Sequence, residues 1–294
     1  MKTADDNGKL YGLADGAQYP EALATWVLEF SPEVRSLFEG LPEEEAGNAA
    51  PILFEIDDAH SEWVRHVDLM DRYRPCFTVV RSALDIDGLK IHFQRFLFAD
   101  IGEGVQVLLR WFDPRSLPSI VDVFGKAASI ELMHPITTWM YRGANSEWQY
   151  LAIDEHSPGD HVGQFSLSLD QRQLDALEKH DEPHALMSEL SDLGLIDANQ
   201  PYAIRYRDFL RRYDRAVQWG LTLRADLHAF CVASYQYGEA FDRQGDIPSA
   251  IRLAVAGEAS LLQAFELVPA YIWRDLMRDV GSRAKPPDGQ EADR

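Results

Sequence analysis

The sequence has few cysteines, few basic residues and no long apolar run. It contains only two cysteines among 294 residues, Cys76 and Cys231, too few for a disulfide framework and typical of a reducing compartment. The longest stretch without Asp, Glu, Lys or Arg runs from Leu227 to Gly238, well short of the ~20 residues that cross a bilayer. The first residues lack the apolar centre of a signal peptide. We therefore expect a cytoplasmic protein without a membrane-spanning segment.

Positive charge is scarce relative to negative charge. Lys and Arg together number 28, against 48 Asp and Glu, so the formal net charge is −20. The acidic residues are spread along the chain rather than gathered in one tail. Such a field repels a phosphate backbone and anionic lipid headgroups. Nucleic acid and membranes are therefore not expected as partners, whereas a basic partner protein, or solubility alone, accounts for the charge.

The sequence patterns of common catalytic sites are missing. There is no GxxxxGK[ST] loop, GxSxG elbow, HExxH helix or pair of CxxC motifs, so no catalytic group or cofactor is expected. One group of metal-ligand type remains, His156, Asp160 and His161, in a polar loop. Two imidazoles and a carboxylate can bind zinc, although a polar surface loop is the simpler interpretation. A metal-dependent α/β hydrolase that uses this loop is therefore the alternative to a non-enzyme.

Strand-like and helix-like patterns alternate in the first half of the chain. Strand patterns lie at 10–15, 52–56, 76–80, 105–112, 136–141 and 148–153, and helical patterns at 21–30, 31–40, 60–74, 84–99 and 117–124. Such alternation is typical of an α/β layer with a mostly parallel sheet, to which the last two strands could add an antiparallel edge. Only helical patterns follow from residue 171 to about residue 280.

We therefore predict two lobes. The first is an α/β domain over residues 1–153, with a mostly parallel sheet and helices. A polar, Pro/Gly-containing linker follows at 154–166. An all-α lobe then covers residues 167–281, and a Pro/Gly/charge-rich tail at 282–294 is expected to be disordered.

The segment Arg110-Trp111-Phe112-Asp113-Pro114-Arg115 joins a predicted strand to a predicted helix. Asp113 suits the N-cap and Pro114 the first helical position. Arg110 and Arg115 then need a carboxylate or carbonyl partner. Because arginine networks are often part of the scaffold, we favour a structural ion pair that fixes this corner. The alternative is recognition of an acidic group or chain terminus of a partner.

A second candidate lies in the helical lobe. Aromatic side chains recur there at spacings of three and four, which places them in one amphipathic stripe that ends at Val217. Tyrosines in such a stripe indicate a half-wet surface, as at interfaces. We favour a core between helices whose hydroxyl groups reach water, with an exposed binding groove as the alternative. The stripe consists of Tyr202, Tyr206, Phe209, Tyr213 and Val217.

Several short motifs in the first lobe follow one another in a specific order. They are Tyr11–Ala17, Ala50–Leu53, Val80–Ser82, His92–Arg95 and Arg110–Arg115. In this order they resemble the type VI secretion effector chaperone and adaptor proteins, a family long catalogued as a domain of unknown function. The resemblance covers residues 10 to about 150. Gln94 stands where that family often has a basic residue, and His134-Pro135 stands where Gly-Pro often precedes the equivalent of Trp139.

The resemblance implies a bacterial cytoplasmic adaptor that is not an enzyme. Such proteins bind a toxic effector before secretion and help to load it onto the valine-glycine repeat spike protein. It also implies that the α/β lobe is a shared frame and the helical lobe an effector-specific surface. Corner-forming or partner-binding roles are therefore expected for Arg95, Arg110, Asp113, Arg115, Tyr202, Tyr206, Phe209 and Tyr213.

Overall fold

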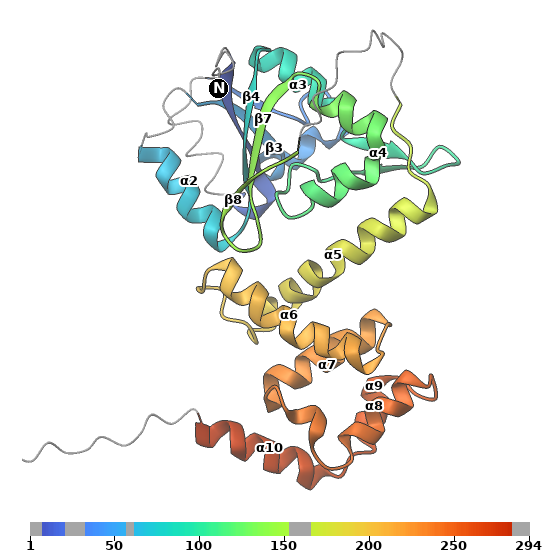
Figure 1. The fold of residues 1–294 in the computed structure, drawn as a ribbon. Helices are drawn as coiled ribbons and strands as arrows, with labels where there is room; N and C mark the ends of the chain where they lie inside the picture. Colours follow the sequence, from blue (N-terminus) through green and yellow to red (C-terminus); the bar gives the residue numbers. More distant parts are fainter. Residues whose placement is uncertain (1–7, 21–32, 57–61, 153–165, 284–294) are drawn as a thin grey trace, which may run out of the picture. The chain divides into compact units, whose positions relative to one another are not determined.

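The computed structural model describes residues 8–20, 33–56, 62–152 and 166–283 (Figure 1). The chain divides into two compact units. The first comprises residues 1–181 with 201–203, and the second comprises 182–200 with 204–294. The predicted helix at 21–30, and nearly all of the predicted linker and tail, lie outside the described residues.

The centre of the first unit is a six-stranded sheet in the order β2-β3-β1-β4-β7-β8. Every neighbouring pair of strands in it is antiparallel. A separate two-stranded sheet, β5-β6, is antiparallel as well. The prediction of a mostly parallel sheet is therefore wrong. The strands are β1 (Lys9–Asp15), β2 (Val34–Ser36), β3 (Pro51–Glu55), β4 (Phe77–Ser82), β5 (Phe98–Asp100), β6 (Gln106–Leu108), β7 (Ile136–Arg142) and β8 (Trp148–Tyr150).

The way the strands are connected explains the error. Alternating strands and helices give a parallel sheet only when each crossover places the next strand beside the last. Strands β3 and β4 do run in the same direction, but β1 lies between them and runs the other way. The chain between β4 and β7 contains two helices and a hairpin, and it returns to form an antiparallel pair. Periodicity shows which segments are strands, but not the direction in which they run.

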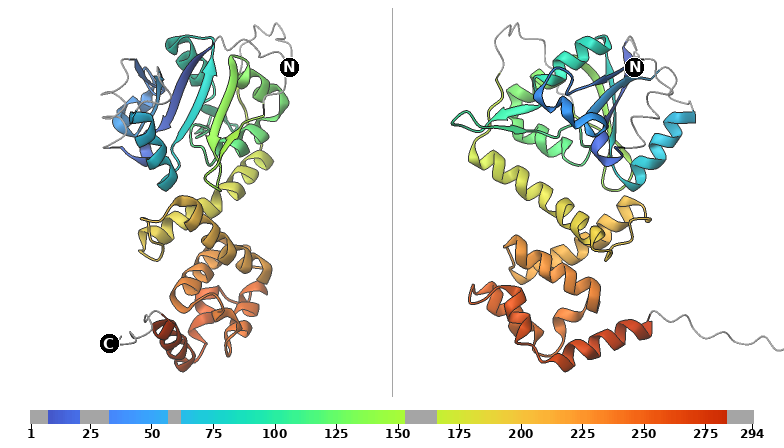
Figure 2. Two further views of the ribbon diagram at one scale, coloured as in Figure 1. Left: turned by 60° about the vertical axis from the view of Figure 1, so that its left-hand side comes forward. Right: turned by 180° about the vertical axis from the view of Figure 1, so that it is seen from behind.

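Helices cover both faces of the sheet (Figures 1 and 2). On one face a core forms around Phe93, Trp111 and Trp139, with the two indole rings perpendicular and 5.8 Å apart. On the other face Phe54 and Phe77 stack with their ring centres 6.0 Å apart. The first face carries α3 (Ile86–Gln94) and α4 (Leu117–Met133), and the second carries α2 (Glu62–Tyr73).

Several local predictions in this unit are wrong. The predicted helix at 84–99 ends at Gln94, and Phe98–Asp100 forms β5 instead. The segment 31–40 was expected to be helical, but Val34–Ser36 forms strand β2 and pairs with β3. Tertiary pairing here overrides a local capping pattern. The segment 105–112 was expected to be one strand, but only Gln106–Leu108 is extended in this way. The aromatic residues Trp111 and Phe112 lie in a turn and are buried in the core, so their apolar character reflects packing rather than a strand.

The described part of the second unit is helical, as predicted. Pro183 lies within a continuous α5 rather than between two helices. In the described part of the chain we find no helix with the length and apolar character needed to cross a membrane. The helices are the end of α5 (Gln171–Asp192), most of α6 (Tyr202–Trp219), α7 (Arg224–Tyr237), α8 (Ile247–Val255), α9 (Leu261–Glu266) and α10 (Ala270–Arg283), with a 3-10 turn, η3 (Phe241–Arg243).

Candidate functional site

The segment 110–115 forms a turn that leads into α4. The backbone N–H of Asp113 donates to the carbonyl of Arg110 over 2.9 Å, and the N–H of Leu117 donates to the carbonyl of Asp113 over the same distance. Helix α4 starts at Leu117, three residues later than the Asp113-Pro114 pattern predicts, and Ser116 precedes it. The Asp113 side chain instead accepts from the N–H of Arg115 at 2.9 Å, which closes a local turn.

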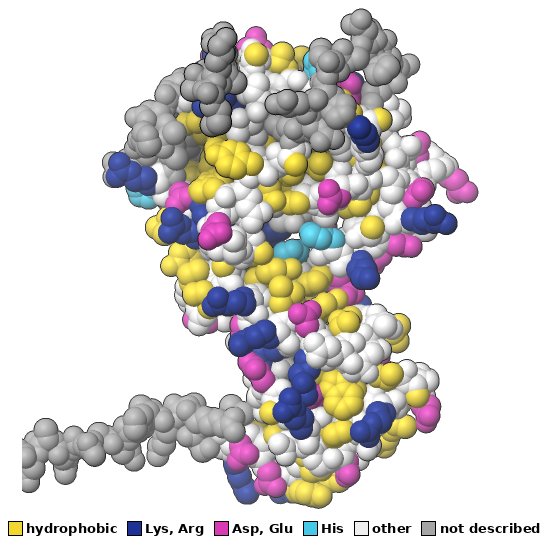
Figure 3. Space-filling view, viewed as in Figure 1, with side chains coloured by type: hydrophobic (Ala, Val, Ile, Leu, Met, Phe, Trp, Pro, Cys, Tyr) yellow, Lys and Arg dark blue, Asp and Glu magenta, His cyan; other side chains and the backbone are white. Residues whose placement is uncertain are grey.

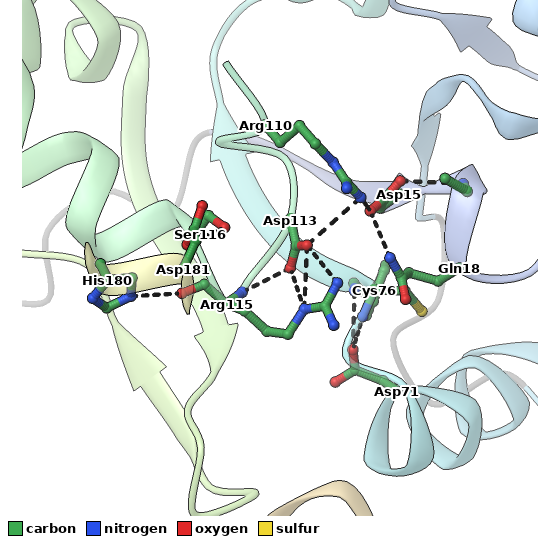
Figure 4. A network of polar contacts seen from close by, with 12 residues as sticks. Asp15, Gln18, Asp71, Cys76, Arg110, Asp113, Arg115, Ser116, His180 and Asp181 are labelled. Atoms are coloured by element: carbon green, nitrogen blue, oxygen red, sulfur yellow. Dashed lines mark hydrogen bonds and ion pairs between the residues drawn. The ribbon is translucent and has the colours of Figure 1, made fainter. Parts of the chain in front are cut away.

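The side chains of Asp113 and Arg115 form a buried, forked ion pair (Figure 4). Nη2 of Arg115 lies 2.6 Å from Oδ2 of Asp113, and Nε lies 2.9 Å from Oδ1. Only 4% of the Asp113 side chain is exposed. A two-pronged contact of this kind fixes the guanidinium plane as well as its charge. The pair therefore holds the turn rigid.

Arg110 links this pair to the central sheet. Its Nη2 lies 2.5 Å from Oδ2 of Asp15 and 3.7 Å from Oδ2 of Asp113. Asp15 ends β1, is fully buried, and also accepts from the N–H of Ala17 and from Gln18. By contrast, 44% of the Arg110 side chain is exposed. We name Asp15, Arg110, Asp113 and Arg115 the arginine corner.

The charges of the arginine corner reinforce one another. Burial alone would raise the pKa of Asp113, but Arg115 and Arg110 outweigh it and hold that pKa below its ordinary value. Burial would lower the pKa of Arg115, but the neighbouring Asp113 raises it. Both groups therefore stay ionised across the physiological range. Two carboxylates and two guanidinium groups in one cluster leave no net charge to be neutralised.

The first half of α5 lies against the turn. Ser116 donates to Oδ1 of Asp181 over 3.0 Å, and Nε2 of His180 lies 3.3 Å from the carbonyl oxygen of Arg115 (Figure 4). Burial raises the pKa of Asp181 above its ordinary value. These contacts connect α5 to the arginine corner within the first unit.

Arg95 is not part of the arginine corner, although the sequence grouped it there. Its Nη2 bonds Oε1 of Glu131 on α4 over 2.8 Å. Its guanidinium also lies over the ring of Phe96, 5.6 Å from the ring centre. Arg95 therefore fastens α3 to α4 at a different place on the first unit.

The tyrosine stripe lies inside the protein rather than in an open groove. Tyr202 and Tyr206 are buried and Phe209 is fully buried, while Val217 at the end of the stripe is exposed. The Tyr206 ring stacks on His184 with centres 4.4 Å apart. The hydroxyl of Tyr213 donates to Oε1 of Glu182 over 2.5 Å. Most of the stripe therefore serves as core, with its hydroxyl groups engaged in polar contacts.

Sequence reasoning missed a second buried ion cluster in the first unit. Arg142, at the end of β7, donates through Nε to Oδ2 of Asp71 over 2.6 Å and also pairs with Asp68. Both Arg142 and Asp71 are buried. In the sequence, Asp71 and Arg142 show only as charged residues that directly follow apolar ones. Many charged residues on a protein surface have the same kind of neighbours. Asp15 was likewise missed, although it lies within the motif Tyr11–Ala17.

Metal-ligand side chains do not gather in the described part of the chain. There we find no group of three or more His, Cys, Asp or Glu side chains arranged to hold an ion. The loop residues His156, Asp160 and His161 lie outside the described residues. Cys76 and Cys231 are free and buried, and burial raises the pKa of both thiols.

The fold and the arginine corner define a two-unit protein, with an antiparallel α+β unit braced by ion pairs and a helical unit. Residues 10–128 of the chain match the family model described as Domain of unknown function (DUF4123). The matched stretch begins within β1, contains the arginine corner and strands β2 to β6, and ends within α4. Strands β7 and β8 of the central sheet lie outside it. No curated protein and no solved structure matches the chain.

Proposed function

We propose that the protein is a non-catalytic chaperone and adaptor. It binds a secreted effector in the cytoplasm and helps to load it onto the valine-glycine repeat spike protein of a type VI secretion apparatus. The proposal is supported by the DUF4123 domain, which spans most of the stretch where the sequence resembles such adaptors. The observation that carries it is the pairing of every charged group in the arginine corner.

That pairing suits a scaffold better than a catalyst. A general acid or base works best with a pKa near the operating pH. In the arginine corner the pKa of Asp113 is lowered and that of Arg115 is raised, so both move away from neutrality. Neither group can readily give or take a proton at pH 7. The corner is instead a rigid surface feature in which Arg110 is half accessible.

Partner binding divides between the two units in this proposal. The first unit, with its DUF4123 domain, is the shared frame. The helical unit supplies the effector-specific surface. Exposed apolar residues there include Leu267, just before α10, and Tyr271, on α10. The chain carries a formal charge of −20, so partner surfaces with basic residues are favoured.

The test is an affinity pull-down of the tagged full-length chain from its own host, with proteins identified by mass spectrometry. We expect a toxin-like effector, with or without the spike protein, at low and moderate salt. An Arg110→Ala variant and a matched Arg95→Ala variant are run beside the wild type. Loss of recovery with Arg110→Ala alone assigns the accessible corner to the partner interface.

The opposite outcome is equally clear. If a host that expresses the secretion genes yields neither an effector nor the spike protein, the adaptor proposal fails. Metal analysis of the purified protein then tests the alternative. Stoichiometric zinc or manganese that is lost in a His156→Ala/His161→Ala double variant favours a metal-dependent hydrolase.

A further inference from the structure

Strand β8 is the outer strand of the central sheet, and no strand of the described residues pairs with its outer side. The N–H of Leu151 donates to the carbonyl of Trp139 over 2.9 Å, and the N–H of Gly143 donates to that of Glu147 over 2.9 Å. In an antiparallel pair, hydrogen-bonded positions alternate with outward-facing ones. The backbone N–H and C=O groups of Gln149 therefore point toward β7. Those of Trp148 and Tyr150 point away from β7, toward the open side of the strand.

The side chains of β8 are also exposed. Tyr150 is 70% exposed and Trp148 is 38% exposed. They lie opposite Met140 and Arg142 of β7, on the same face of the sheet. No Pro, Lys or other charged residue occupies β8, although such residues commonly protect an open edge from pairing. The opposite edge differs, because all three residues of β2 are partly buried and its Arg35 is held by Asp87.

A buried ion cluster holds this exposed strand in place. Arg142 pairs with Asp68 and Asp71 of α2, and its Nη1 donates to the carbonyl of Ser146 in the β7-β8 turn over 2.6 Å. Its guanidinium lies over the Trp148 ring at 4.7 Å from the ring centre. A three-residue edge strand contributes little core of its own. The cluster therefore pre-organises an edge that faces outward, which lowers the entropic cost of binding there.

We propose that the β8 edge binds an extended segment of a partner protein, which adds to the sheet as a seventh strand. Its backbone pairs with Trp148 and Tyr150, and an apolar side chain packs against the Tyr150 ring. Basic residues flank that segment, because Glu147 and Asp122 are exposed beside the hairpin and Arg142 is already paired. The geometry of the edge carries this inference, and it holds whether or not the partner belongs to a secretion system.

Charge argues against a second copy of the chain as the occupant. Each copy carries a formal charge of −20, so pairing two β8 edges brings strongly like-charged molecules together. On the face drawn in Figure 3, acidic and basic side chains are interspersed and the visible apolar patches are separated. The negative charge of the protein attracts a basic extended segment, whereas it repels a second copy of the chain.

The test selects binders from a phage-displayed library of linear dodecapeptides with the full-length chain as bait. Selected peptides are then measured against three proteins: wild type, Tyr150→Pro and Tyr150→Thr. Proline at 150 removes an outward N–H but no hydrogen bond to β7, and open edges tolerate it. Threonine keeps the N–H and removes only the ring. We expect peptides with alternating apolar residues and flanking Lys or Arg, at least ten-fold weaker on Tyr150→Pro and less affected by Tyr150→Thr.

A second measurement uses the wild-type protein alone, so that it does not depend on how the variants fold. Hydrogen exchange of the Tyr150 amide should slow at least ten-fold when a selected peptide is added, while the Gln149 amide changes little. The proposal is overturned if no peptide is enriched, if selected peptides bind Tyr150→Pro as tightly as wild type, or if the Tyr150 amide is not slowed. A concentration-dependent dimer that Tyr150→Pro abolishes would also overturn it, in favour of a second copy.

Discussion

The carboxylate of Asp71 and the guanidinium of Arg142 meet inside the first unit, with Nε of Arg142 2.6 Å from Oδ2 of Asp71. The other carboxylate oxygen of Asp71 accepts from the backbone N–H groups of Cys76 and Phe77, at 2.8 and 2.9 Å. One side chain near the end of α2 thus accepts hydrogen bonds from two backbone N–H groups at the start of β4 and from the guanidinium of Arg142 at the end of β7. A helix, a central strand and the exposed β7-β8 hairpin all depend on it.

Burial raises the pKa of Asp71 from its ordinary value of 3.8 to about 6. Between those values the folded protein binds a proton that the unfolded chain has released. The contribution of Asp71 to the free energy of unfolding therefore falls as the pH rises from about 4 to 6. A shift of roughly two units corresponds to about 3 kcal/mol. Urea unfolding of wild type and Asp71→Asn across this range measures it.

Asn cannot titrate at this position, so the difference in unfolding free energy between the two proteins isolates Asp71 from the other carboxylates. We expect the advantage of wild type over Asp71→Asn to shrink with rising pH. A difference that grows with rising pH contradicts the prediction. It would mean that Arg142 and the two amides keep Asp71 ionised despite its burial.

Replacing Arg115 by Met should strongly destabilise the first unit. The change leaves the buried carboxylate of Asp113 without its forked partner, and Arg110 lies 3.7 Å away. Breaking one side of a buried pair typically costs about 3–5 kcal/mol. Urea unfolding at pH 7 measures this loss, with Arg95→Met as the matched control. The control breaks a partly exposed pair with Glu131, where about 1 kcal/mol or less is expected. Equal losses in both variants would contradict a buried, coupled corner.

Replacing Arg110 by Met should cost much less than replacing Arg115. Its side chain is 44% exposed, so solvent screens the ion pair and about 1 kcal/mol is expected. Asp15 also keeps its bonds from Ala17 and Gln18. A loss as large as that of Arg115→Met would show that Arg110 is mainly structural. A small loss of stability combined with a loss of partner recovery would place it in the interface.

Replacing Gly12 by Ala should destabilise the first unit although Gly12 lies in an ordinary strand. A methyl group there would come within 2.2 Å of the Phe54 ring and 2.8 Å of the Phe77 ring, which stack above it. Overpacking of a closely fitted core typically costs about 1–3 kcal/mol. Thermal and urea unfolding measure the loss. Unchanged stability would mean that the two rings can move apart without cost, contrary to their close packing.

The sequence predicted the positions of most elements but not their arrangement. Apolar runs correctly located β1, β3, β4 and β7, because each of these strands is buried and its residues need apolar neighbours. The direction of the strands depends on contacts between distant segments, such as β1 with both β3 and β4. Local periodicity carries no record of those contacts.

The candidate site was also predicted only in part, because one of its contacts joins segments that are far apart in the sequence. The unmet need of Arg110 and Arg115 for carboxylates pointed to an ion-paired corner, and the structure supplies Asp113 and Asp15. Asp113 could be anticipated because it is two residues from Arg115. Asp15 is far away in the sequence and reaches Arg110 only through the fold. The tyrosine stripe has a correct helical period, but periodicity alone does not show which side of the stripe a second helix covers.

The second unit has its own buried carboxylate, Asp242 on η3. Its Oδ2 accepts from Nε of Arg215 and from Nε1 of Trp219, each over 2.6 Å. Both donors lie near the end of α6, so one fully buried side chain fastens that helix to the turn after α7. Trp219→Phe keeps an aromatic ring and removes one donor, and should cost about 1–3 kcal/mol. Asp242→Ala leaves both donors unmatched and should cost about 3–5 kcal/mol.

Coupling between these residues gives the sharper measurement. If Trp219 acts through Asp242, then Trp219→Phe should cost less in an Asp242→Ala background than in wild type, because its acceptor is already gone. Hydrogen exchange of the α6 amides follows the helical unit without assuming that the whole chain unfolds in one step. Additive losses in the double variant would show that the indole contributes through packing, and that the shared carboxylate does not join α6 to η3 in the way the distances indicate.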